Sequence, residues 1–222
     1  MSQALSFFQR RVLGVLIEKA LAQPAYYPMT LNAIAAACNQ KNNRDPEMSV
    51  DEETVYQTLE ELRGLGLVTR VLTSGGRTDR FKHLANEVYG WDGKQRAVMA
   101  EFLLRGPQTL AELRTRCSRM TPFDSAEHVT AVLDALAAHD PPFVMLLPRA
   151  PGQREARYTH LMYPPDEAPL TPKSDAAHDS VGQRSGDGGA LKADIEAIQN
   201  QLVELQRAVD RLEQRLDTLE GR

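Results

Sequence analysis

The chain has 222 residues, which is room for one or two domains of ordinary size. Its content of 42% hydrophobic and 25% charged residues is typical of a globular protein in water. The apolar run from Val12 to Ile17 is too short to cross a bilayer, so we expect no membrane segment. The net charge of −4 lies in residues 164–222, which leaves the rest nearly neutral and excludes the strongly basic character of an avid nucleic-acid binder.

The first 90 residues are predicted to form a helix, a short helix, a longer helix and a β-hairpin. Apolar residues at helical spacing predict the first helix over residues 6–22. Thr30 is expected to cap the short helix, and Ser49 or Asp51 the longer one. The predicted strands cover residues 67–72 and 78–83, on either side of a glycine turn.

Residues 91–163 are predicted to repeat this order. Thr30 to Cys38 and Thr109 to Cys117 share the pattern T-L-x-x-(I/L)-x-x-x-C. The segments Arg80 to His83 and Arg157 to His160 end the two hairpins in the same way. Helix, short helix, longer helix and hairpin is the order of a winged helix. We therefore predict a mostly α fold with small β-hairpins (α+β), built from two tandem winged-helix domains at residues 1–90 and 91–163.

A flexible linker and a coiled coil are predicted to follow the second domain. Residues 164–190 are rich in Pro, Gly, Ser and Asp and have no apolar period, which is typical of a linker. Residues 191–222 carry apolar residues at alternating gaps of three and four, which is the seam of a coiled coil. The seam favours a parallel homodimer, with a trimer or an antiparallel pairing as alternatives. The seam residues are Leu191, Ile195, Ile198, Leu202, Leu205, Val209, Leu212, Leu216 and Leu219.

No pattern in the chain indicates catalysis, a cofactor or a metal site. Paired C-x-x-C motifs, H-E-x-x-H, G-x-S-x-G and a glycine-rich phosphate loop after a strand are all missing from the sequence. Cys38 and Cys117 fall on the apolar side of the two short helices and are expected to be buried thiols. We therefore expect a non-enzymatic protein without a cofactor, in the reducing cytoplasm.

Two groups of polar residues are candidates for binding DNA or a protein partner. One is the loop after the first short helix, where amide and guanidinium groups suit base edges or phosphates, but asparagines also satisfy loop backbone. The other is the basic residues of the hairpins, which could contact phosphates or only keep the hairpins soluble. The candidates are Asn39, Gln40, Lys41, Asn42, Asn43, Arg44, Arg77, Arg80, Lys82, Arg149, Arg154 and Arg157.

The third helix of each domain argues against simple DNA recognition. With its apolar residues turned inward, the first presents Glu53, Gln57, Glu60 and Glu61, and neither outward face carries Lys or Arg. Carboxylates in a major groove are repelled by the phosphates. Two functions therefore stay open: a dimeric regulator that binds double-stranded DNA, and a scaffold whose winged helices bind a protein.

Several long motifs resemble the YceH family of bacterial proteins. They include residues 11–19, 27–33 and 37–44 in the first domain and residues 104–109 and 147–161 in the second. The resemblance covers roughly residues 6–163 and is weakest between Pro46 and Val55. It implies two winged helices, often with a C-terminal coiled coil, in a bacterial cytoplasmic protein. It implies no catalytic residue.

Overall fold

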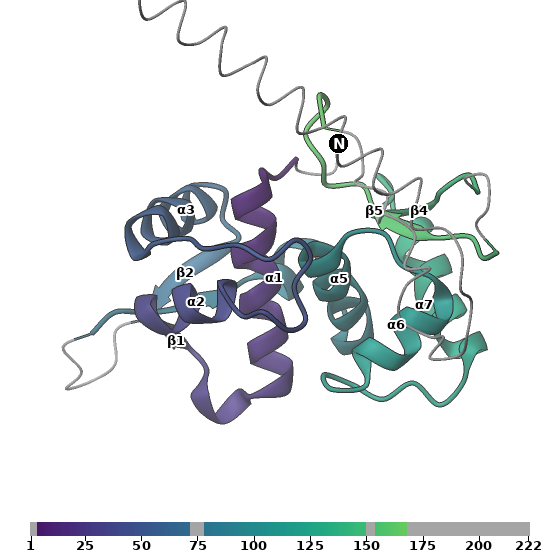
Figure 1. Cartoon of the computed structure of the whole chain (residues 1–222), viewed down its shortest axis with the longest axis horizontal. Helices are drawn as coiled ribbons and strands as arrows, with labels where there is room; N and C mark the ends of the chain where they lie inside the picture. Colours follow the sequence, from purple (N-terminus) through teal and green to yellow (C-terminus); the bar gives the residue numbers. More distant parts are fainter. Residues whose placement is uncertain (1–3, 72–77, 150–153, 168–222) are drawn as a thin grey trace, which may run out of the picture. The chain divides into compact units, whose positions relative to one another are not determined.

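The computed structural model describes residues 4–71, 78–149 and 154–167, which belong to one compact unit of helices and small antiparallel sheets (Figure 1). The predicted combination of α-helices with small β-sheets is confirmed. Arg77, the coiled-coil segment 191–222 and most of the predicted linker lie outside the described residues.

The first repeat, residues 6–83, has the predicted order of helices, and its helix caps explain where each begins. Ser6 and Gln9 form a capping box, and the Thr30 hydroxyl accepts a hydrogen bond from the Ala33 N–H. Asp51, one of two predicted caps, accepts from the Thr54 N–H at 2.8 Å. The elements are α1 (Phe7–Ala22), the 3₁₀ turn η1 (Pro24–Tyr26), β1 (Met29–Thr30), α2 (Leu31–Cys38), α3 (Glu52–Gly64), β2 (Val68–Val71) and β3 (Arg80–His83).

The hairpin of the first repeat gains a third strand that the sequence did not predict. β1 pairs antiparallel with β3, with Thr30 opposite Arg80, so the order of the sheet is β1-β3-β2. β2 and β3 pair as predicted, with Val68 opposite His83. A strand of two residues is too short to show alternation, so only the pairing reveals it.

The second repeat, residues 92–160, has the same order with a smaller sheet. A short helix that was not predicted, α4 (Ala85–Tyr89), leads into it. Asp92, Thr109 and Ser125 cap the three helices of this repeat. Its elements are α5 (Gly93–Arg105), α6 (Leu110–Cys117), α7 (Ala126–Ala137), β4 (Val144–Leu146) and β5 (Tyr158–His160).

Matching side chains make matching contacts in the two repeats. The Arg80 guanidinium donates to the Pro28 carbonyl at 2.8 Å, and Arg157 donates to the Pro107 carbonyl at 3.1 Å. His83 and His160 each accept a backbone N–H from two residues further along, at 3.2 and 3.0 Å. Cys38 and Cys117 each end the second helix of their repeat. The residues of each pair therefore lie in or directly beside corresponding elements of the two repeats.

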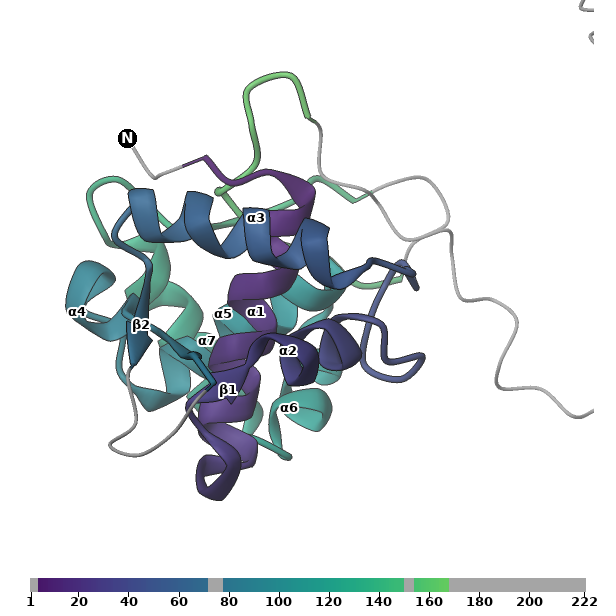
Figure 2. The ribbon, with the colours of Figure 1, turned by 90° about the vertical axis from the view of Figure 1, so that its left-hand side faces the viewer.

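Helices α1 and α5 join the two repeats through one continuous core. No other two described elements pack so extensively, and Figure 2 shows α2 and α3 in front of α1, with α5 beyond it. A Cβ atom on Gly14 would lie 3.0 Å from the Leu103 Cβ and from the Leu104 Cγ. A larger residue at this position would therefore push the Leu103 and Leu104 side chains away, so glycine suits the close approach of the two helices. The buried apolar residues of both repeats form a single cluster.

The segment after β5 is tied to the start of α1. The Arg10 guanidinium forms an ion pair with Glu167, with Nη1 3.0 Å from Oε2, and lies over the Tyr163 ring. Tyr163 stacks on His160, and the Leu5 N–H donates to the Met162 carbonyl. The compact unit therefore extends beyond residue 163, into the segment predicted as a linker.

Candidate functional site

The loop that joins α2 to α3 is held closed by its first residue. The Asn39 amide donates to the Val50 carbonyl at 2.7 Å, and its oxygen accepts from the Val50 N–H at 2.8 Å. This reciprocal pair joins the two ends of the loop, as a backbone pair would. Asn39 therefore satisfies loop backbone groups, which is one of the two roles that the sequence analysis gave to the loop asparagines.

Arg44 lies inside the protein and not on the loop surface. Its guanidinium binds both carboxylate oxygens of Glu18, at 3.1 and 2.6 Å, and Nε donates to the Ala37 carbonyl at 3.0 Å. The Arg44 side chain is 0% exposed and the Glu18 side chain 1%. A duplex or partner cannot reach it, so we assign Arg44 to the interior and correct its proposed place on a binding surface.

Glu18 and Arg44 belong to a buried ion cluster that crosses from one repeat to the other. The cluster consists of Glu18, Arg44, Glu101, Arg105 and Arg119. Arg119, just after α6, donates to both carboxylates. Arg105 lies 3.6 Å from Glu101 and donates to the Asn43 side-chain oxygen at 2.8 Å. Charge pairs therefore fix the junction between the repeats in addition to apolar packing.

Burial dominates the electrostatics of this cluster. It raises the pKa of Glu101 to about 7, although the nearby arginines favour the carboxylate. Burial also lowers the pKa of Arg44 and of Arg119 to about 10, so both guanidiniums stay charged at neutral pH. A buried pair is stable only while both partners are present, because either charge alone is poorly solvated.

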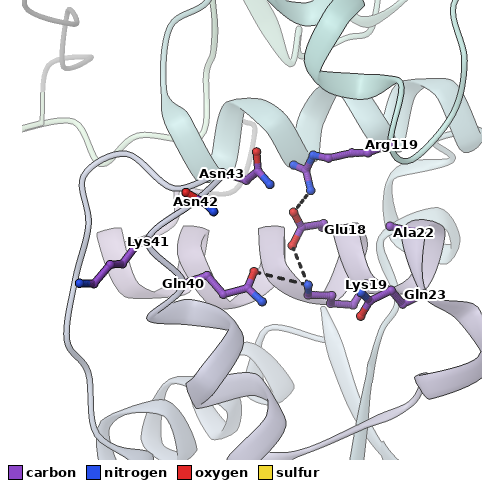
Figure 3. A pocket seen from close by; sticks show the side chains of 9 residues that line it. All are labelled: Glu18, Lys19, Ala22, Gln23, Gln40, Lys41, Asn42, Asn43 and Arg119. Carbon is purple, nitrogen blue, oxygen red and sulfur yellow. Dashed lines mark hydrogen bonds and ion pairs between the residues drawn. The ribbon is translucent and has the colours of Figure 1, made fainter.

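A polar hollow of about 550 Å³ opens onto the ion cluster (Figure 3). Its walls come from the C-terminal half of α1, the loop after α2 and Arg119 of the second repeat. The lining residues are Glu18, Lys19, Ala22, Gln23, Gln40, Lys41, Asn42, Asn43 and Arg119. Four of the six loop residues proposed from the sequence therefore meet in one place, together with residues that the sequence analysis did not single out.

The lining is cationic and rich in amides. Lys19 Nζ lies 3.4 Å from the Gln40 side-chain oxygen and 3.8 Å from Glu18, as the dashed lines of Figure 3 indicate. Burial and the neighbouring Arg44 lower the pKa of Lys19. Lys41 stands at the edge of the hollow with its ammonium pointing away from Glu18. Ala22 is the one apolar side chain of this lining.

The described basic residues of the hairpins differ in their surroundings. Arg80 binds the Pro28 carbonyl, and Arg157 binds both the Pro107 carbonyl and Glu112, the latter at 2.8 Å. Lys82 is half-buried, whereas Arg149 and Arg154 are exposed. Two of the candidate arginines therefore have contacts within their own repeat, and two are directed to solvent.

The third helix of each repeat presents the acidic face that the sequence predicted. On α3, Glu53, Gln57 and Glu61 are exposed, Glu60 is half-buried, and Tyr56 is 37% exposed beside them. On α7 the exposed residues are Glu127, Ala131, Asp134, Ala135 and Ala137. Arg63, the one basic residue of α3, forms an ion pair with Glu60.

Both cysteines and the two hairpin histidines are buried in the protein interior. Cys38 and Cys117 are free and buried, as predicted, and burial raises the pKa of Cys38 to about 12. Burial lowers the pKa of His83 to about 4 and of His160 to about 3, so both rings are neutral hydrogen-bond acceptors. Within the described ranges, no three His, Cys, Asp or Glu side chains converge as metal ligands would.

Comparison with known proteins places the chain in a family. The family model described as "Protein of unknown function, DUF480" matches residues 5–153. The chain belongs to this family. Similar members are a UPF0502 protein of Koribacter versatilis (44% identical over 188 residues, 85% of this chain and 87% of the relative) and one of Geobacter sulfurreducens (49% over 152 residues, 68% and 69%). A third, from Citrifermentans bemidjiense, is 41% identical over 225 residues and covers 94% of this chain and 99% of the relative.

The family relationship expected from the motifs is therefore confirmed. The match includes the loop after α2, the hollow and both charged helices of the junction. Among the described helices, none combines the length and the apolar character that crossing a membrane requires.

Proposed function

We propose that the chain is a non-enzymatic tandem winged-helix protein that dimerises through residues 191–222 and binds a protein partner through α3. The order of elements in each repeat supports the winged-helix assignment, with β2 and β3 as one wing and β4 and β5 as the other. The apolar seam of the tail supports the dimer.

The observation that carries the proposal is the exposed face of α3. A winged helix that reads DNA places this helix in the major groove, between two rows of phosphates. Here the face offers Glu53 and Glu61, whose carboxylates are repelled by phosphates, with the neutral Gln57 beside them. Tyr56 stands among them, and tyrosine is enriched in protein interfaces because it combines a large apolar ring with a hydroxyl. The face therefore suits a protein partner with complementary basic groups.

DNA binding is the second candidate, and the hairpin of the second repeat favours it. Arg149 and Arg154 are exposed and lie in the segment between β4 and β5. Wing arginines at such positions can contact phosphates or enter a minor groove. In this mode the wings would supply the affinity and α3 would contribute little.

Site-specific photo-crosslinking in cells tests the first candidate. A photoreactive amino acid at Gln57 is expected to give a discrete covalent adduct with one protein, and the same residue at Glu87 of α4 serves as the exposed control. Tyr56→Ala should abolish the adduct at Gln57 because it removes the apolar centre of the face. Adducts of equal yield at Gln57 and Glu87 would refute binding through α3.

Fluorescence anisotropy with a labelled duplex tests the second candidate. If the wings bind DNA, Arg149→Ala and Arg154→Ala should each lower the slope of log affinity against log salt by about 0.9. Glu53→Gln is the matched control and should leave the affinity unchanged or raise it, since it removes a repelling charge. No binding at low salt would exclude DNA as the partner.

A further inference from the structure

The junction between the repeats carries more positive than negative charge. The ion cluster has three guanidiniums and two carboxylates, and Lys19 adds one cation at the hollow, an excess of two. The exposed Lys41 stands at the edge of the hollow. Of the other charges that act on the cluster, Arg11 and Asp45 cancel each other, and Arg116 is paired with Glu112. A low-polarity interior amplifies such an excess, because fewer water molecules screen it.

Glu18, the acidic residue of the hollow wall, cannot offset this excess for an incoming ligand. Both of its oxygens are occupied: Oε1 accepts from Arg44 and Arg119, and Oε2 from Arg44 at 2.6 Å. The opening of the hollow therefore presents ammonium and amide groups from the other lining residues. Burial lowers the pKa of Lys19, and the positive charge of Arg44 lowers it further.

The chemistry of the lining defines a ligand class. Lysine ammonium and Asn or Gln amides donate hydrogen bonds, and a ligand rich in charged acceptor oxygens satisfies them. The lining has no aromatic side chain on which a base or other flat ring could stack. A volume of about 550 Å³ is that of a small-molecule site, yet most such sites are apolar. The ligand is therefore small, polar and multiply anionic.

We propose that this hollow binds a small oxyanion-bearing molecule, held by Lys19 and the loop amides against the charged junction of the two repeats, with the exposed Lys41 side chain turning inward from the edge onto the bound anion. Phosphate and carboxylate groups share the required chemistry of clustered anionic oxygens. The site combines Lys19 and the loop of the first repeat with Arg119 of the second, so the bound anion would stabilise their junction. The inference does not depend on whether α3 binds a protein or the wings bind DNA.

Isothermal titration calorimetry on the full chain tests the site with defined probes. Inorganic phosphate, pyrophosphate and citrate are titrated at equal ionic strength, with chloride as the balancing anion, so that phosphate and carboxylate chemistry are separated. We expect saturable binding of one anion per chain for at least one probe. Lys19→Gln and Lys41→Gln should each weaken it about tenfold, as expected for one lost charge-assisted hydrogen bond.

Lys82→Gln is the matched control, because it makes the same chemical change at a lysine that does not line the hollow. It should leave the affinity unchanged within about twofold, and urea unfolding of each variant checks that the fold is intact. An equal loss of affinity in all three variants would show unspecific attraction to a basic surface and overturn the proposal. So would the absence of saturable binding for all three probes.

Discussion

The buried pair between Glu18 and Arg44 makes a quantitative prediction about stability. Glu18→Gln keeps the shape of the side chain and removes its charge. The Arg44 side chain is 0% exposed, so water cannot replace the lost carboxylate. The guanidinium keeps its bonds to the Ala37 and Asn43 carbonyls, but these dipoles do not neutralise it. The variant therefore leaves a buried cation without its counterion.

The expected loss follows from the geometry. Two opposite charges about 4 Å apart attract by about 4 kcal/mol at the effective dielectric constant of a protein. Glu18 also faces Arg119, which keeps Glu101 as its second partner and limits the additional loss. Removing one partner of a buried pair typically costs about 3 to 5 kcal/mol. In a unit of this size that lowers Tm by about 6 to 20 °C.

Urea unfolding at neutral pH, followed by the fluorescence of Trp91, measures this loss. Trp91 is the single tryptophan and is buried against Tyr89, so its emission reports the folded core. Glu53→Gln, the same change on the exposed face of α3, should shift the free energy of unfolding by no more than about 0.5 kcal/mol. A loss below about 1 kcal/mol for Glu18→Gln would refute the argument that the cluster is poorly solvated.

Three further predictions concern other parts of the molecule. Because the pKa of Glu101 is about 7 in the folded state and about 4.5 in the unfolded state, the folded state binds more protons between these values. The contribution of Glu101 to the free energy of unfolding therefore decreases as the pH rises from about 4.5 to about 7. Urea unfolding of Glu101→Gln across this range should not show this decrease. Cys38 and Cys117 should react with a thiol reagent only on unfolding, since burial raises both pKa values; rapid reaction of the native protein would contradict their burial. Light scattering should show a dimer for the full chain and a monomer for residues 1–174, which retain the ion pair of Arg10; a dimeric fragment would place the interface in the compact unit.

Local signals in the sequence accounted for most of the secondary structure. Helical spacing and capping residues such as Thr30 and Thr109 located the helices, because each of these signals acts within one turn. β1 and α4 were missed because two and five residues are too few to show a period. Their existence depends on partners distant in the sequence, such as Arg80 opposite Thr30.

The candidate site was predicted only in part, for a related reason. The polar loop after α2 was recognised from its composition, but its arginine was assigned to the surface because charged side chains are usually exposed. The burial of Arg44 depends on Glu18, 26 residues earlier, and no local pattern connects the two. A signal was present in the helices themselves. Glu101 lies within a stretch of buried residues and Glu18 ends one, and a charge in such a place requires a partner.

The close approach at Gly14 has a consequence for what the protein can recognise. Since α1 packs closely on α5 at Gly14 and the two repeats share a core, the outer helices α3 and α7 are held at a fixed separation. A molecule that touches both would be selected by the distance between its two contact points. A partner whose two contact points match this separation binds both helices, and no flexible connection has to become ordered. A partner with a different spacing contacts only one of the two helices.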